Sequence, residues 1–164
     1  MKQLLKEWKQ FLSEEKYTVF RGTDKDLSVT DFDLEKTIEF GFHFGSEESA
    51  KHRGSSKQDN FYLKKYQLII NNPLFLEDAM RWTLESVLEQ MLRKGLTSKD
   101  KIDELINLAK SSARKNYSSL TKEKNMVLKD YLNELGYDGI IYENKGESGG
   151  NAFIVWNTEQ IQEI

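Results

Sequence analysis

The segment Phe20-Arg-Gly-Thr23 places polar groups at the end of a short apolar run. Arg21 supplies a guanidinium, which pairs with phosphate or carboxylate oxygens through two parallel hydrogen bonds. Gly22 permits the close approach of a ligand to the backbone, and Thr23 completes the segment. These residue types fit a strand end that binds an anionic ligand, although a lone arginine also fits a surface ion pair.

A second polar cluster lies where a strand is expected to give way to a helix. Gly41-Phe-His-Phe-Gly-Ser46 carries His43, and Ser46 is the expected N-cap of a helix that runs towards Arg53. The N–H groups at the start of such a helix suit a phosphate or a carboxamide. Taken alone, His43 also fits a hydrogen-bonded structural histidine, and Arg53 a cation that the helix dipole favours near a C-terminus.

A third polar cluster follows the apolar run Gly139 to Tyr142. The segment from Glu143 to Asn151 is rich in glycine, which predicts an adaptable loop, and it carries Asn144 and Glu147. The carboxylate of Glu147 fits two interpretations equally, a catalytic group and a solvated loop charge.

Several kinds of chemistry are excluded by what the chain lacks. It has no cysteine and only two histidines, His43 and His52, which excludes thiolate zinc sites, a cysteine nucleophile and a His-rich metal site. The P-loop, GxGxxG, GxSxG and HExxH patterns are also absent. We therefore expect no metal cofactor.

The order of these segments resembles the ADP-ribosyltransferase superfamily, particularly its small members from phages and phage-associated polyvalent proteins. The family pattern has an Arg-Gly or His-Gly strand end, then a junction of the form Gly-hydrophobic-His-Phe-Gly-Thr/Ser. A strand leading into Asn-Pro follows, as at Ile70-Asn-Asn-Pro73. The Gly-Tyr-Asp-Gly-Ile and Tyr-x-Asn-x-x-Glu pieces are matched by Gly136 to Glu147, and the last strand ends in Gln160-Ile161.

The resemblance implies an α+β fold with an ADP-ribosyltransferase-like split β-sheet core, formed by one domain over residues 1–164. The ends of the chain, Thr18 to Arg53 and Gly136 to Ile164, would build an NAD-type cleft, and a helical insert would span about 76–135. The implied activity is mono-ADP-ribosyl transfer from NAD to a host macromolecule, with a host protein as the expected partner.

Residue roles carry over from the family position by position. Arg21 would anchor NAD, His43 would shape the nicotinamide ribose pocket, and Glu147 would supply the carboxylate that stabilises the oxocarbenium-like charge on the ribose. These three are the catalytic candidates. The NAD-binding positions implied by the resemblance are Arg21, Gly22, Thr23, His43, Phe44, Ser46, Arg53, Tyr142 and Asn144.

The chain departs from the poly(ADP-ribose) polymerase branch, whose catalytic glutamate starts the last strand. Ala152 stands at that position, and Arg21 stands where that branch has histidine. Polymer synthesis is therefore not expected. An inactive ADP-ribosyltransferase fold that binds a protein or a nucleotide is the alternative, and NAD hydrolysis or transfer from 2′-phosphorylated RNA is a third interpretation.

Hydrophobic periodicity predicts the elements that must position these clusters. Strands are expected at Tyr17–Phe20, ending at Arg21-Gly22, and at Thr37–Phe44, Phe61–Ile70, Gly139–Tyr142 and Phe153–Trp156, with a last edge strand within Glu159–Ile164. An amphipathic helix is expected over Lys2–Leu12 and a polar loop over Gly54–Asp59. Three helices are expected between Leu76 and Leu135. The first has an apolar face from Met80 to Leu92 and closes at Gly95. The second is capped by Thr97 or Ser98, and the third starts at Thr121 and ends at Gly136.

Composition places the chain among ordinary globular proteins. Its 164 residues are 38% hydrophobic and 31% charged, with a net charge of −3. That charge gives no reason to expect a nucleic acid partner or an anionic membrane. The absence of a signal peptide and of a long apolar run predicts a cytoplasmic protein, in the host cytosol if it is encoded by a phage.

Overall fold

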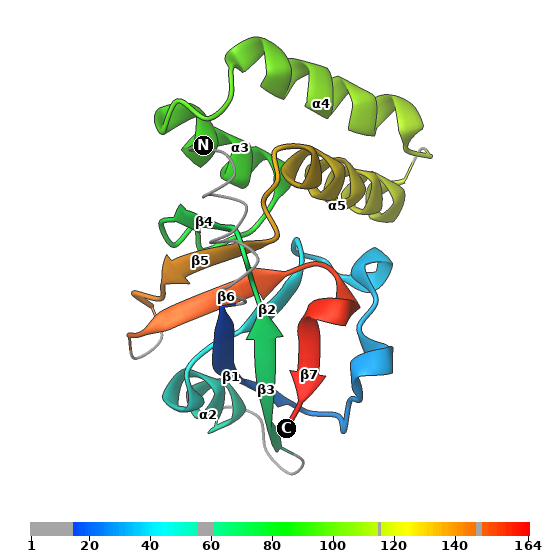
Figure 1. Ribbon diagram of the computed structural model, residues 1–164. Helices are drawn as coiled ribbons and strands as arrows, with labels where there is room; N and C mark the ends of the chain where they lie inside the picture. The colour runs from blue at the N-terminus through cyan, green and yellow to red at the C-terminus, as the bar shows by residue number, and fades with distance from the viewer. Residues whose placement is uncertain (1–14, 56–60, 115, 147–148) are drawn as a thin grey trace.

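The computed structural model describes residues 15–55, 61–114, 116–146 and 149–164, and it has mixed α+β architecture, as predicted (Figure 1). Three helices form a layer above two small β-sheets. The strands are β1 (Lys16–Thr23), β2 (Phe42–Phe44), β3 (Tyr62–Ile69), β4 (Pro73–Leu76), β5 (Gly139–Glu143), β6 (Asn151–Val155) and β7 (Ile161–Glu163). The α-helices are α2 (Glu47–Ser55), α3 (Leu84–Arg93), α4 (Lys99–Ser112) and α5 (Tyr117–Glu134).

The two sheets meet beside the first two polar clusters. One sheet has the order β1-β3-β7 and is antiparallel; the other has the order β2-β6-β5-β4, in which only β4 and β5 are parallel. Phe20 and Gly45 exchange two backbone hydrogen bonds of 2.9 and 3.0 Å and so link β1 to the residue after β2. This bridge brings the residue after Phe20, Arg21, close to the β2–α2 junction.

Aromatic side chains fill the space where the sheets meet. Phe32 lies 5.2 Å from Phe42 and 5.8 Å from Phe44 between ring centroids, and Phe44 lies 5.3 Å from Tyr66. Phe42 and Phe44 are buried while the intervening His43 is half-buried, as the period of two predicts for a strand. The core therefore fixes the backbone on both sides of His43.

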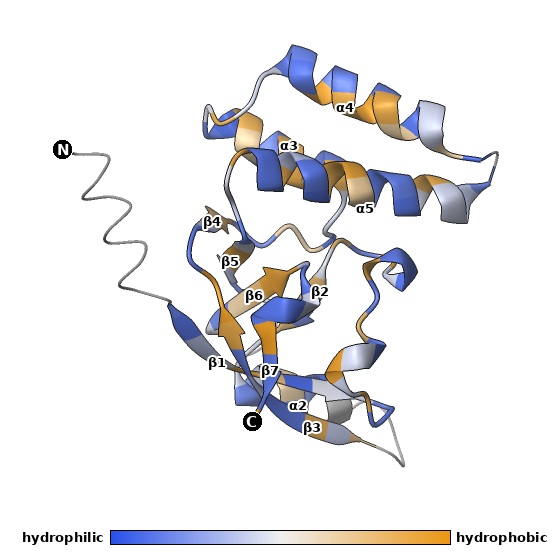
Figure 2. Cartoon of the chain, turned by 45° about the vertical axis from the view of Figure 1, so that its right-hand side comes forward, coloured by the Kyte–Doolittle hydropathy of each residue, from blue (hydrophilic) through white to orange (hydrophobic). Residues whose placement is uncertain are grey.

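The helical layer is joined by short loops and packs on the second sheet. Side-chain oxygens of Thr83, Ser98 and Asn116 cap α3, α4 and α5 by accepting from the backbone N–H three residues later. The apolar side of α4 faces α3 and α5 (Figure 2). Three predicted helices are thus confirmed, but α5 starts near Asn116 rather than at Thr121.

Two parts of the predicted secondary structure near the site are wrong. The strand expected over Thr37–Phe44 exists only from Phe42, because Gly41 adopts a φ of 81° and Phe40 donates its N–H to Trp82 O instead of to a neighbouring strand. Conversely, the strand expected to end at Arg21-Gly22 continues to Thr23, which pairs with Tyr62 of β3.

Further differences lie around the helical region. Pro73 does not merely end β3: it is the first residue of β4, an edge strand, and the first residue of an edge strand is a place where sheets tolerate proline. Met80 lies outside α3, is 87% exposed and has a φ of 58°, so it does not contribute to the apolar face. The predicted helix Lys2–Leu12 and most of the predicted loop Gly54–Asp59 lie outside the described residues.

Candidate functional site

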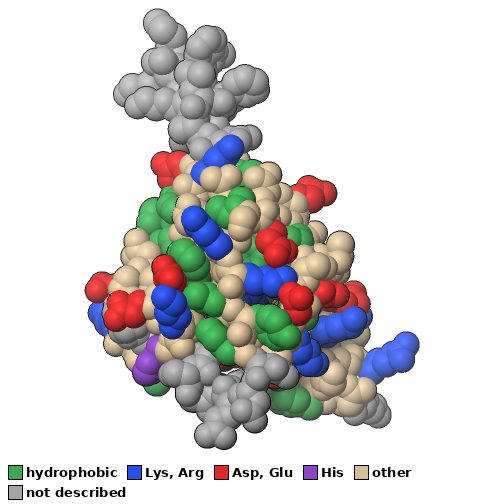
Figure 3. All heavy atoms as spheres, turned by 90° about the horizontal axis from the view of Figure 1, so that it is seen from below, with side chains coloured by type: hydrophobic (Ala, Val, Ile, Leu, Met, Phe, Trp, Pro, Cys, Tyr) green, Lys and Arg blue, Asp and Glu red, His purple; other side chains and the backbone are tan. Residues whose placement is uncertain are grey.

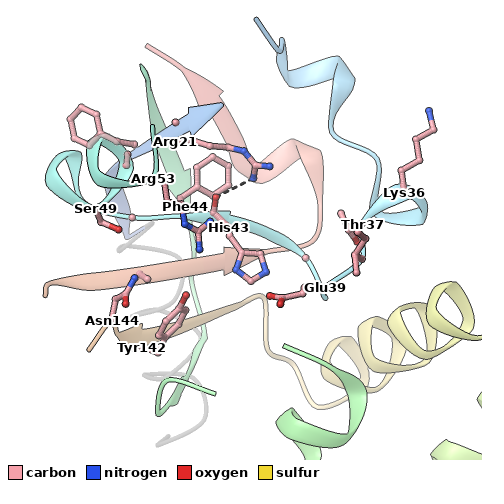
Figure 4. A pocket seen from close by; sticks show the side chains of 17 residues that line it. Arg21, Lys36, Thr37, Glu39, His43, Phe44, Ser49, Arg53, Tyr142 and Asn144 are labelled. Carbon is pink, nitrogen blue, oxygen red and sulfur yellow. Dashed lines mark hydrogen bonds between the residues drawn. The ribbon is translucent and has the colours of Figure 1, made fainter. Parts of the chain in front are cut away.

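A pocket of about 410 Å³ opens where β1, β2, α2 and β5 converge on the segment before β2 (Figure 4). Its walls come from segments more than a hundred residues apart in the sequence. The lining residues are Phe20, Arg21, Gly22, Lys36, Thr37, Ile38, Glu39, Gly41, His43, Phe44, Gly45, Ser49, Ala50, Arg53, Tyr142, Asn144 and Ala152.

Arg21 points into this pocket from β1 and is half-buried. Its Nη1 donates to His43 O at 3.1 Å, and its Cζ lies 5.1 Å from the centroid of the Phe32 ring and 5.8 Å from that of Phe44. No carboxylate pairs with it among the residues described by the structure. Burial, together with the nearby Arg53 charge, lowers the pKa of Arg21, although Tyr66 opposes this. Such a guanidinium is suited to an anionic ligand.

His43 is held in its neutral form. Its Nε2 lies 2.9 Å from Phe40 O, and since a carbonyl oxygen only accepts, Nε2 carries the proton. Burial lowers the pKa of His43 to about 4; the hydrogen bond to Phe40 raises it, and the charges of Arg53 and Arg21 lower it further. At neutral pH the ring therefore adds no charge to the pocket.

The start of α2 contributes less to the pocket than its sequence indicates. Ser46 caps the helix as predicted, since Ser49 N donates to Ser46 Oγ at 3.1 Å, but Ser46 does not line the pocket. Ser49 and Ala50, one helical turn further along, and Arg53, two turns along, do line it. Arg53 thus adds a second guanidinium to the wall that holds Arg21.

Tyr142 and Asn144 form the opposite wall, on β5 and just after it. The Tyr142 ring packs against Trp82 with centroids 4.5 Å apart. Asn144 is buried: its Oδ1 accepts from Gly146 N at 3.2 Å, and its backbone N–H donates to Gly150 O at 2.9 Å. These bonds close the base of the loop between β5 and β6. Glu147, the predicted carboxylate in this loop, lies outside the described residues.

Most of the predicted NAD-binding residues share this pocket, with two exceptions among the described ones. Thr23 does not line it; the Thr23 hydroxyl donates to Lys25 O at 2.5 Å. Ser46 acts as a helix cap. The predicted residues that do line the pocket are Arg21, Gly22, His43, Phe44, Arg53, Tyr142 and Asn144.

Glycine is needed at position 22 for packing, a requirement that the sequence alone does not reveal. A Cβ at this position would lie 2.5 Å from Ala50 O and 2.5 Å from the Phe61 ring. Glycine is therefore required for the close contact between β1 and α2, whether or not a ligand approaches it.

The sequence interpretation missed a whole wall of the pocket, the segment Lys36 to Glu39. A strand predicted over Thr37 to Phe44 places Thr37, Ile38 and Glu39 in a sheet. One signal was available: Gly41 inside an alternating run is typical of a bulge or a bend, and ending the strand there would have left this wall as a loop.

The described ranges offer neither a cluster of metal-ligating side chains nor a helix suited to a membrane. No group of three or more His, Cys, Asp or Glu side chains is arranged there to hold a metal ion. None of the helices within these ranges has the length and apolar character needed to cross a membrane.

Comparisons with known proteins leave the family of this chain open. No model of a known protein family matches the sequence, and no curated protein matches it either. A solved structure described as the crystal structure of an anti-CRISPR protein is similar with a TM-score of 0.40 and 15% identity, covering 91% of this chain and 96% of that chain. A likeness at that level carries no argument about fold family or function.

Proposed function

We propose that this protein has an ADP-ribosyltransferase-like fold, binds NAD in the pocket around Arg21 and transfers single ADP-ribose units to a host macromolecule. The observation that carries the proposal is the convergence of Arg21, His43, Arg53, Tyr142 and Asn144 on one pocket. The pocket's volume, about 410 Å³, is in the range of small-molecule sites.

The charges of the pocket support a ligand with an anionic part and a part that becomes cationic. Arg21 and Arg53 would bind the pyrophosphate, since guanidinium groups match its oxygens in pairs. Breaking the nicotinamide–ribose bond develops positive charge on the ribose. A protonated histidine there would oppose that charge, whereas the neutral His43 ring can hydrogen-bond without doing so.

The carboxylate that stabilises this charge is proposed to be Glu147. It belongs to the loop whose base is closed by the hydrogen bond between Asn144 and Gly150. A cleft of this type acts on NAD as a substrate and uses no metal. The proposed location is the cytosol of a host cell.

Titration calorimetry with NAD, followed by labelling with radioactive NAD in a host lysate, tests the proposal. We expect the wild type to bind NAD and to label a macromolecule. Arg21→Gln should weaken binding by about tenfold or more, since it removes charge-assisted hydrogen bonds. Arg93→Gln is the matched control, because Arg93 is exposed on α3 and does not line the pocket. Glu147→Gln should bind NAD and fail to transfer. Labelling by Glu147→Gln at the wild-type rate would refute the assignment of that residue.

A second candidate, a binding module without catalysis, is favoured by one observation. Ala152 lines the pocket at the start of β6, the position at which the polymerase branch carries its catalytic glutamate. Acidic and basic side chains are interspersed over the face opposite the helical layer (Figure 3), which suits a protein partner better than a nucleic acid.

NAD binding without nicotinamide release would support a nucleotide-binding module, and no binding at millimolar NAD would support protein docking alone.

A further inference from the structure

Glu39 brings a carboxylate into the pocket that the motif positions do not include. Among the lining residues described by the structure it is the only acidic one, beside Arg21, Lys36 and Arg53. It belongs to the wall before β2, and its carboxylate points towards the His43 ring (Figure 4).

The backbone around Glu39 is fixed on both sides. Before it, Thr37 O accepts from the buried Asn125 Nδ2 of α5 at 3.2 Å. After it, Phe40 N donates to Trp82 O at 2.8 Å, and Phe40 O accepts from His43 Nε2. These two anchors fix the backbone from which the Glu39 side chain extends into the pocket.

The carboxylate itself is not used by the fold. No hydrogen bond or ion pair engages Glu39 anywhere in the described part of the chain, and its side chain is half-buried. Glu35 and Asp33, in the same stretch, are instead paired with Lys122 and Lys36. Glu39 therefore has no structural task that would explain a negative charge at this position.

The electrostatics indicate which part of a ligand Glu39 would meet. A carboxylate repels phosphate oxygens, so it weakens binding if it lies at the pyrophosphate. It stabilises a group with hydroxyl donors, and more strongly one that becomes positively charged. In NAD, that group is the ribose attached to nicotinamide.

We infer, on the basis of the proposed function, that Glu39 contacts the nicotinamide-side ribose and acts as a further catalytic residue. It accepts a hydrogen bond from a ribose hydroxyl and stabilises the charge that develops as the bond from C1′ to the nicotinamide nitrogen breaks. The electron pair of that bond leaves with nicotinamide, which becomes neutral. The acceptor nucleophile forms a bond to C1′ and loses its proton, which passes to water.

The test compares two ligands, ADP-ribose, which contains this ribose, and ADP, which lacks it. In calorimetry, Glu39→Gln should lower the affinity for ADP-ribose by about tenfold, the size expected for a charged hydrogen bond, and leave the affinity for ADP unchanged. Glu89→Gln is the matched control, since Glu89 is an exposed carboxylate on α3 outside the pocket. Nicotinamide release should fall further than ADP-ribose affinity, because the charge exists only in the transition state.

Each outcome separates this inference from the proposed function. If wild-type protein binds ADP-ribose and Glu39→Gln binds it equally well, the inference is wrong and the proposed pocket stands. If Glu39→Gln binds both ligands more tightly, Glu39 lies at the pyrophosphate and the inference is again wrong. If wild type binds neither ligand, both the proposed function and the inference fail.

Discussion

Asn125 joins the helical layer to the pocket, and removing its side chain should disturb both stability and binding. It lies on α5, is only 2% exposed and donates from Nδ2 to Thr37 O at 3.2 Å. Thr37 lines the pocket two residues before Glu39. The change Asn125→Ala therefore leaves the Thr37 carbonyl without this donor and releases one end of the pocket wall.

The size of the effect follows from burial. Losing this partly buried hydrogen bond costs about 1 kcal/mol, and the cavity left by the buried Asn125 side chain brings the total loss of unfolding free energy to about 2–4 kcal/mol. In a chain of this length that corresponds to a fall in Tm of roughly 5–12 °C. Loosening the wall should weaken ADP-ribose binding by about fivefold.

Urea unfolding followed by circular dichroism measures the loss of unfolding free energy, and calorimetry measures the affinity for ADP-ribose. Gln90→Ala is the matched control: Gln90 is a buried amide on α3 that exchanges two hydrogen bonds, of 2.8 and 2.9 Å, with the backbone of Glu77, away from the pocket. The Gln90→Ala variant should be less stable than the wild type and should bind ADP-ribose with unchanged affinity. If Asn125→Ala also keeps its affinity, the helical layer does not hold the pocket wall and the reasoning is refuted.

Three other changes should alter stability measured by urea or thermal unfolding. Met80→Gly should stabilise the fold by about 0.5–1 kcal/mol, because Met80 is exposed with a φ of 58°, which glycine adopts without strain; a loss of stability would contradict this. Gly22→Ala should lower the unfolding free energy by about 1–3 kcal/mol, since the added Cβ would lie 2.5 Å from Ala50 O. An unchanged urea midpoint would contradict this and would mean that α2 can move aside. The pKa of His43 is about 4, below the ordinary value of 6.5, so the unfolded chain binds a proton at a higher pH than the folded protein does. The neutral ring therefore contributes fully to the unfolding free energy above pH 6.5, and this contribution is lost as the pH falls towards 4. Because the ring is half-buried, the loss of unfolding free energy over this pH range should be about 2 kcal/mol. His43→Gln should make the unfolding free energy nearly independent of pH over the same range.

Local patterns predicted the elements that depend on local interactions. The caps at Ser46 and Ser98, the helix ends at Gly95 and Gly136, and the alternating burial of β2 follow from residue types a few positions apart. In contrast, β4 could not be predicted, since a four-residue strand starting at proline becomes a strand only by pairing with β5, more than sixty residues later.

The same distinction applies to the pocket. Glycine and apolar runs in the sequence predict the strand ends that carry Arg21 and His43, whereas Tyr142 is predicted as a pocket residue only through the family resemblance. The wall containing Thr37 and Glu39 has no such pattern, because its position depends on hydrogen bonds to Asn125 and Trp82 from distant parts of the chain. The sequence predicts Gly22 as a site for ligand approach, whereas its packing against α2 depends on the three-dimensional contact with Ala50.

A crystal structure of the protein with a non-hydrolysable NAD analogue tests the account most directly. We expect the pyrophosphate within hydrogen-bonding distance of Arg21, and the nicotinamide-side ribose between His43 and Glu39. A ligand bound elsewhere on the protein, with the pocket around Arg21 empty, would contradict the account.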